Sequence, residues 1–169
     1  EVLLGDGFRI TGSDSSESEV TRRLRTLGAE IFIGHSAAHL QDVEVVVFSN
    51  AIKFDNPELV EARARLIPII PRAEMLAELM RMKAGVAISG THGKTTTTSL
   101  VGAVLTEGEL DPTVIVGGRL RRIEGGVRQG AGQIMVVEAD EYEKSFLRLS
   151  PTLVVVTNID ADHIECYGS

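Results

Sequence analysis

Short apolar segments alternate with amphipathic segments along the 169 residues of this chain, and this alternation restricts the fold more than any other feature. The apolar segments, such as residues 43–48 and 153–156, are rich in β-branched side chains, as buried parallel strands are. The segments between them carry capping residues followed by apolar side chains at helical spacing. These patterns predict an α/β fold in which helices pack on the faces of parallel sheets.

The expected elements follow one another in a regular order. We expect strands over residues 8–12, 31–33, 43–48, 86–89, 114–116, 134–137 and 153–156. We expect helices over residues 17–27, from Pro57 onward, over 73–81 and over 94–105. The apolar face of the Pro57 helix is predicted to be Leu59, Val60 and Ala64, and that of the last helix Leu100, Val101, Val104 and Leu105.

The strand–helix rhythm restarts at Gly85, which predicts a domain boundary near residue 83. The two predicted domains are residues 1–83 and 84–169. The chain begins without a capping residue and stops one loop after an apolar strand, so we expect both domains to be truncated, the first at its start and the second at its end.

Composition excludes several classes of protein. With 43% hydrophobic and 24% charged residues the chain is expected to be globular rather than disordered. A net charge of −7 argues against nucleic acid or an anionic membrane as the main partner. The single cysteine, Cys166, cannot form an internal disulfide and no signal peptide is recognisable, so a reducing cytoplasm is the expected location. The oligomeric state is not predicted.

A glycine-containing loop, Gly90-Thr-His-Gly-Lys-Thr-Thr-Thr-Thr98, joins a predicted strand to a predicted helix. Backbone N–H groups and the helix dipole at such a position favour an anion, Lys94 adds a positive charge, and the Thr95 hydroxyl suits Mg²⁺. The strict Walker spacing is not met, because Ile88 stands where the first glycine would be. We still predict nucleotide phosphate binding by this loop, with the candidate residues Gly90, Thr91, His92, Gly93, Lys94, Thr95 and Thr96.

Polar residues also follow two other predicted strands. Glu138 directly follows one strand, and His163 lies a few residues beyond another. Because parallel strands bring their carboxyl ends to one edge of a sheet, Lys94, Thr95, Glu138 and His163 are expected to converge. Hard oxygen ligands favour Mg²⁺ there. His163 has alternatives, a hydrogen-bonding role or a zinc site, and the acidic cluster after Glu138 also suits a solvated face.

The segments GTHGKTTTT, VVEADEYEKSFLRLSP and VVVTNIDADH resemble the Mur ligase family of peptidoglycan synthesis. The resemblance implies a Rossmann-like UDP-binding domain followed by the first part of a P-loop-type parallel-sheet ATP-binding domain. It implies ATP-dependent ligation of L-alanine to the carboxylate of UDP-N-acetylmuramate through an acyl phosphate. It also implies that Lys94 contacts the β- and γ-phosphates, that Thr95 and Glu138 hold one Mg²⁺, and that His163 helps to hold a second. His92 has no assigned role.

The first half of the chain is implied to bind the UDP-sugar, through Asp14, the Ser49-Asn50-Ala51 turn and Arg72. Two of these residues have a simpler interpretation: Asp14 as the cap of the following helix, and Arg72 as a surface residue at a helix start. The isolated fragment is expected to be inactive as a ligase.

Two other functions compete with this prediction. A sister ligase that attaches a murein tripeptide to the same UDP-sugar shares GTHGKT, although RAEMLAELMR and the run TTTT favour L-alanine as the acceptor. A non-catalytic P-loop nucleotide-binding protein would keep the loop without the ligation.

Overall fold

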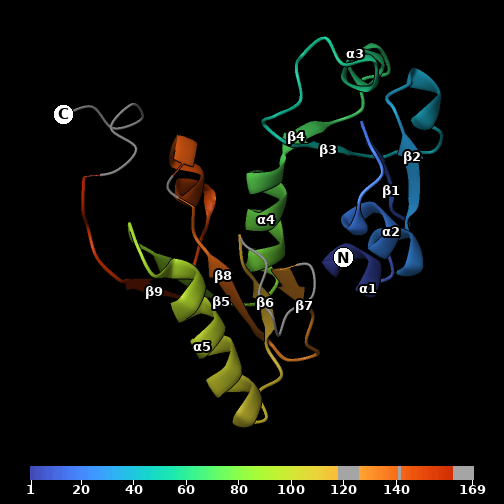
Figure 1. The fold of residues 1–169 in the computed structure, drawn as a ribbon. Coiled ribbons are helices and arrows are strands. Elements are labelled where there is room, and N and C mark those ends of the chain that lie inside the picture. The colour runs from blue at the N-terminus through green and yellow to red at the C-terminus, as the bar shows by residue number, and fades with distance from the viewer. Residues whose placement is uncertain (118–125, 141, 162–169) are drawn as a thin grey trace. The chain divides into compact units, whose positions relative to one another are not determined.

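The computed structural model describes residues 1–117, 126–140 and 142–161 (Figure 1). The chain divides into two compact units, Glu1–Met75 and Leu76–Ser169. This division falls inside helix α4 (Arg72–Arg81). The domain boundary near residue 83 stays a prediction.

The first unit contains two separate parallel strand pairs (Figure 1). Strand β1 (Thr11–Asp14) pairs with β2 (Glu30–Ile33), and β3 (Val46–Phe48) pairs with β4 (Ile69–Pro71). The other elements are α1 (Val2–Gly5), α2 (Glu19–Thr26), the 3₁₀ helix η1 (Ala37–His39) and α3 (Pro57–Ala64). Each parallel pair is joined through a helical connection, as the parallel geometry requires.

Capping residues fix where the helices of this unit begin. The Ser18 hydroxyl accepts a hydrogen bond from the Thr21 N–H, and the Thr21 hydroxyl accepts one from the Ser18 N–H, so these residues form the capping box of α2. Asn56 caps α3, and Pro57 occupies its first turn. The predicted apolar face of α3 is partly wrong, because the buried residues are Leu59 and Ala62, whereas Val60 is half exposed. Their spacing of three residues sets the buried stripe.

The second unit is built on one five-stranded sheet with the order β7-β6-β8-β5-β9. The strands are β5 (Ala84–Ser89), β6 (Thr113–Ile115), β7 (Val127–Arg128), β8 (Ile134–Glu138) and β9 (Leu153–Val156). All neighbours are parallel except β7, which runs antiparallel to β6. Helix α5 (Lys94–Glu107) connects β5 to β6, and the 3₁₀ helix η3 (Tyr142–Arg148) follows β8.

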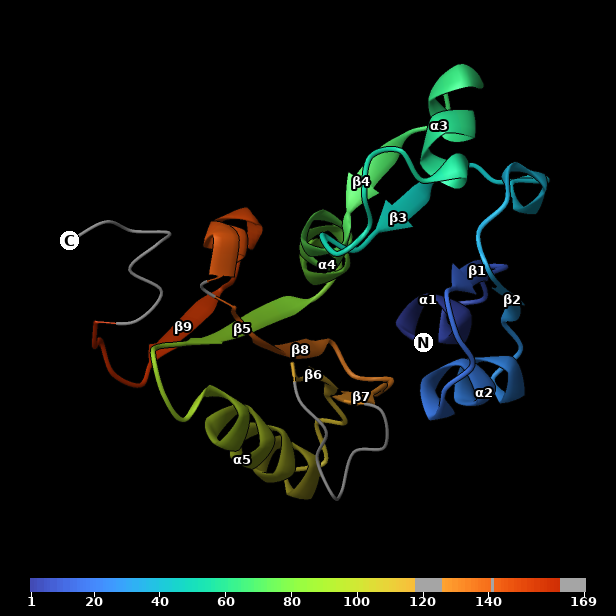
Figure 2. The ribbon, with the colours of Figure 1, turned by 45° about the horizontal axis from the view of Figure 1, so that its top comes forward.

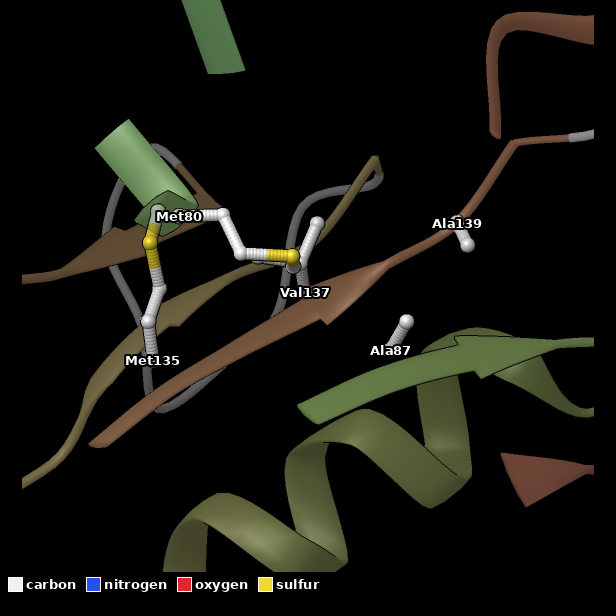
Figure 3. Packing of buried hydrophobic residues seen from close by; sticks show 5 residues of the cluster. All are labelled: Met80, Ala87, Met135, Val137 and Ala139. Carbon is white, nitrogen blue, oxygen red and sulfur yellow. The ribbon is translucent and has the colours of Figure 1, made fainter. Parts of the chain in front are cut away.

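Side chains on both faces of the inner strands β5, β6 and β8 are buried, as expected of strands inside a parallel sheet. On one face, Met80 of α4 packs with Ala87, Met135, Val137 and Ala139, and its side chain extends from the helix over the strands (Figure 3). On the other face, α5 lies along the sheet (Figure 2) and covers a second cluster. That cluster consists of Ile88, Val114, Val116 and Val136.

The buried face of α5 differs from the predicted one. Val101 and Leu105 pack on the sheet as expected, but Leu100 and Val104 are 61% and 69% exposed. Thr98 and Gly102 are buried instead. Among the described residues, no helix is both long enough and apolar enough to cross a membrane.

Candidate functional site

The loop that follows β5 has a backbone that only glycine adopts easily. Gly90 has φ +128° and Gly93, the N-cap of α5, has φ +80°. The glycine loop (residues 90–96) therefore turns sharply from β5 into the first turn of a 14-residue helix. The orphan N–H groups and the positive end of the helix dipole at this position favour an anion.

Lys94 folds back onto this loop. Its ammonium group donates hydrogen bonds to the carbonyl oxygens of Gly90 at 2.7 Å and Thr91 at 3.1 Å. The positive charge is thus held beside the loop backbone rather than extended into solvent. A phosphate oxygen can replace these carbonyl oxygens as the acceptor, because a charged acceptor binds an ammonium group more strongly than a neutral acceptor does.

Glu138, the last residue of β8, lies against the first turn of α5. Thr95 Oγ1 is 2.9 Å from Glu138 Oε1 and 3.0 Å from Oε2, and the Gly117 N–H donates to Oε2 at 2.8 Å. The strand-end rule predicts this position for both residues, because β5 and β8 are parallel neighbours. The arrangement presents a hydroxyl and a carboxylate, two hard oxygen ligands, at the first turn of α5.

The end of β9 also contacts the glycine loop, and sequence reasoning missed this role. Thr157 Oγ1 lies 2.6 Å from the His92 carbonyl oxygen, and the Asn158 side chain makes two hydrogen bonds to the His92 backbone. The signal was present, since β9 was predicted to be a parallel strand of the same sheet. Pairing of β9 with β5 brings its polar end to the loop.

His92 takes part in these contacts through its backbone. His163 lies outside the described residues. The side chains of His92 and Thr96 are exposed. Within the described ranges, no group of three or more His, Cys, Asp or Glu side chains is arranged to hold a metal ion.

The residues predicted to bind a UDP-sugar lie in or at the end of the first unit. Asp14 ends β1 and accepts a hydrogen bond from the Ser16 N–H, and it does not cap α2, because Ser18 does. Ser49 Oγ accepts from the Ala51 N–H in the turn with Asn50 after β3. Arg72 is the exposed first residue of α4.

A second polar cluster, which the sequence did not predict, gathers around Glu58 of α3. Ser13 Oγ donates to Glu58 Oε2 at 2.6 Å, and His39 Nδ1 lies 2.7 Å from Oε1 and must donate, because a carboxylate only accepts. Burial raises the pKa of Glu58, but hydrogen bonds from Ser13, His39 and the Ser36 N–H, with the nearby His35, outweigh it and leave the pKa below 4.5. The cluster ties β1 and the segment around η1 to α3.

The fold and the loop define an α/β protein in which a parallel strand, a glycine loop and a helix form a P-loop-type unit. Comparison with family models then places the chain more narrowly. Residues 1–84 match the model described as "Mur ligase family, catalytic domain", and residues 88–169 match "Mur ligase middle domain". The chain belongs to the Mur ligase family.

Curated relatives and solved structures resemble the chain over nearly all of its length. It is 60% identical over 167 residues to the UDP-N-acetylmuramate–L-alanine ligase of Geotalea uraniireducens, a match that covers 99% of this chain and 36% of that relative. The crystal structure of UDP-N-acetylmuramate-alanine ligase from Thermotoga maritima matches with a TM-score of 0.88 and 38% identity, over 99% of this chain and 40% of that one.

A second solved structure, the UDP-N-acetylmuramate:L-alanyl-γ-D-glutamyl-meso-diaminopimelate ligase from Neisseria meningitides, matches less closely. Its TM-score is 0.85 and its identity is 27%, over 99% of this chain and 58% of that one. The chain therefore spans less than two thirds of the length of each of these relatives.

Proposed function

We propose that this chain forms the UDP-sugar-binding and phosphate-binding parts of an ATP-dependent ligase. The ligase joins L-alanine to the carboxylate of UDP-N-acetylmuramate in the synthesis of peptidoglycan precursors. The observation that carries the proposal is the contact of Thr95 with Glu138 at 2.9 Å beside Lys94, at the start of α5. The names of the relatives that are 60% and 38% identical support the substrates.

The reaction would proceed in two steps. The muramate carboxylate attacks the γ-phosphorus of ATP, forming an acyl phosphate and releasing ADP. The L-alanine amine then attacks the acyl carbon, forming the amide, releasing phosphate and losing a proton. The glycine loop and Lys94 would bind the phosphates and stabilise the charge that develops on the transferring group.

The donor set suits a magnesium ion. Thr95 Oγ1 and the Glu138 carboxylate are hard oxygens, and a site with two such donors leaves room for the phosphate and water ligands that Mg²⁺ prefers. Thr95 and Glu138 would hold the ion, with His163 proposed for a second one. When bound, Mg²⁺ neutralises phosphate charge. Before it binds, Gly117 N–H and Thr95 keep the Glu138 carboxylate oriented.

In the first unit, Asp14, Ser49, Asn50 and Arg72 remain the proposed contacts of the UDP-sugar. Asp14 stands at the carboxyl end of β1, where ligands of parallel α/β folds bind. Ser49 and Asn50 follow the carboxyl end of β3 in the same way.

The proposal is tested by phosphate release in the full-length protein that carries this chain. We expect release to require both UDP-N-acetylmuramate and L-alanine, and Lys94→Ala to lower turnover by at least about a hundredfold, because removing one preorganised transition-state donor has an effect of this size. Arg22→Ala, an exposed cation on α2, is the matched control and should leave turnover unchanged.

Two other outcomes would favour the competing functions. Release that requires a murein tripeptide in place of L-alanine would identify the sister ligase, to which the Neisseria structure corresponds. Nucleotide binding that depends on Lys94 without any acceptor-dependent release would identify a non-catalytic nucleotide-binding protein.

A further inference from the structure

The end of strand β9 is hydrogen-bonded to two consecutive residues of the glycine loop. The Thr91 N–H donates to the Asn158 carbonyl oxygen at 3.2 Å. The Thr91 hydroxyl accepts from the Asp160 N–H at 2.9 Å and lies 3.3 Å from the Asp160 carbonyl oxygen. Thr91 is thus bound through both its backbone and its side chain, although the two segments are almost 70 residues apart in the sequence.

The side chain of Asn158 forms hydrogen bonds with both the N–H and the carbonyl oxygen of His92, the next residue of the loop. Its Oδ1 accepts from the His92 N–H at 2.9 Å, and its Nδ2 donates to the His92 carbonyl oxygen at 2.9 Å. Thr157 Oγ1 lies 2.6 Å from the same carbonyl oxygen and 3.2 Å from that of Ser89. One amide side chain therefore fixes His92 as a neighbouring strand would, with one donor and one acceptor.

The packing around Gly90 leaves no room for a side chain. A Cβ atom at Gly90 would lie 2.2 Å from Thr157 Oγ1 and within 3.0 Å of the Asn158 backbone. The loop backbone and the β9 end are therefore in direct contact, and a shift of one moves the other.

We propose that Asn158, supported by Thr157, is a positioning residue that holds the glycine loop in its nucleotide-binding shape. A loop with two glycines at positive φ loses much conformational freedom when it is ordered, and contacts that order it beforehand raise affinity for its ligand. The proposal rests on phosphate binding by this loop.

The same contacts decide which N–H groups meet the phosphates. The N–H groups of Thr91 and His92 are already donated to the carbonyl oxygen and the side chain of Asn158. The anion is therefore bound by the first turn of α5, from Gly93 onward, together with the Lys94 ammonium. Asn158 acts on the nucleotide through the loop and does not touch it.

The test compares Asn158→Ala with Asn158→Asp, and Thr157→Val with Thr157→Ser, in the full-length protein. Asn158→Asp keeps an acceptor for the His92 N–H but loses the donor to its carbonyl oxygen, whereas Thr157→Ser keeps the hydroxyl that Thr157→Val removes. Ile159→Ala is the matched control, because Ile159 is 87% exposed on the same turn. The measurements are hydrogen exchange of the His92 amide, ATP affinity by calorimetry, and the KM values for ATP and the UDP-sugar.

We expect Asn158→Ala to accelerate exchange at His92 and to weaken ATP binding by about tenfold, which corresponds to the loss of about 1.4 kcal/mol. The KM for the UDP-sugar should stay within about twofold, a separation that a general loss of structure would not produce. Asn158→Asp and Thr157→Val should weaken ATP binding, and Thr157→Ser should restore it.

ATP affinity equal to that of the unmodified protein in both Asn158 variants would overturn the proposal, whether or not exchange changes. If the unmodified protein binds ATP but has no ligase activity, the proposed ligation fails while exchange and affinity still test the positioning role. If it binds no ATP at all, both proposals are wrong.

Discussion

Gly90 is the residue whose replacement the loop tolerates least. Its φ of +128° is unfavourable for any side chain, and an added Cβ would collide with the Asn158 backbone, which cannot rotate away as a side chain can. We expect Gly90→Ala to weaken ATP binding by more than about tenfold and to destabilise the protein by more than the about 1–3 kcal/mol of backbone strain alone. Calorimetric ATP titration and urea unfolding measure the two effects.

Gly93→Ala is the comparison for Gly90→Ala. Gly93 also has positive φ, +80°, but nothing lies within 4 Å of an added Cβ. We expect a loss of only about 1–2 kcal/mol of stability, the usual difference for a left-handed residue. Equal destabilisation by the two variants would show that contact with β9 does not matter.

Glu58 makes the stability of the first unit depend on pH. Its pKa is lower in the folded protein than the ordinary value of 4.5, so the folded state binds fewer protons than the unfolded chain in this range. The stabilisation is therefore present above the ordinary value and is lost as pH falls through the lower, folded value.

Glu58→Gln should remove this dependence. We expect the difference in unfolding free energy between the unmodified protein and Glu58→Gln to shrink between about pH 5 and about pH 3, where carboxylates titrate. Glu61→Gln on the same helix is the control, because Glu61 pairs with Arg65 near the surface and such pairs contribute little. Urea unfolding across this range measures the effect, and a constant difference would contradict it.

At the scale of elements, α5 packs closely on the sheet because Gly102 has no side chain. An added Cβ at Gly102 would lie 2.8 Å from Val114 Cγ2 and 3.2 Å from Cγ1. Replacing glycine by alanine stabilises a helix interior by about 1 kcal/mol, but overpacking costs about 1–3 kcal/mol. The cost of overpacking should therefore equal or exceed the gain in helix propensity.

A double-mutant cycle separates these two effects. We expect Gly102→Ala to be neutral or destabilising alone and to be stabilising in a Val114→Ala background, where the contacting methyl groups are gone. Denaturant unfolding of the four proteins gives the coupling energy. Equal effects in both backgrounds would mean that α5 and β6 move apart without loss.

The same helix shows what periodicity alone predicts and what it misses. The start of α5 and the end of the strand before it follow from composition and spacing, and so does the position of Thr95 and Glu138 at one sheet edge. The buried face does not, because Thr98 and Gly102 are buried whereas Leu100 and Val104 are exposed. Which apolar residues are buried depends on how closely the helix and the sheet pack. The pattern of apolar residues in the sequence does not carry that information.

The Asn158 contact was missed for a related reason. Spacing along the chain placed Thr157 and Asn158 after a strand, but only the strand order sets β9 beside β5, and hence beside the loop. The Glu58 cluster likewise joins side chains from three separate segments. Contacts between distant segments depend on the topology, whereas a single strand, turn or helix depends mostly on its own residues.

At the scale of the whole molecule, each compact unit has buried residues of its own. Leu59 is 2% exposed in the first unit, and Met135 is 1% exposed in the core of the second. We expect Leu59→Ala and Met135→Ala each to destabilise its own unit by about 2–5 kcal/mol, as buried Leu and Met truncations do. Hydrogen exchange resolved along the chain measures the loss of protection in each unit.

Helix α4 decides where the division between the units lies. Leu76, Leu79 and Met80 pack on the cluster that contains Met135, so the second half of α4 should lose protection with Met135→Ala and not with Leu59→Ala. A boundary near residue 83 requires the opposite result, in which the whole helix follows Leu59. If either substitution lowers protection equally throughout residues 1–161, the chain unfolds as one cooperative unit, and neither boundary describes its energetics.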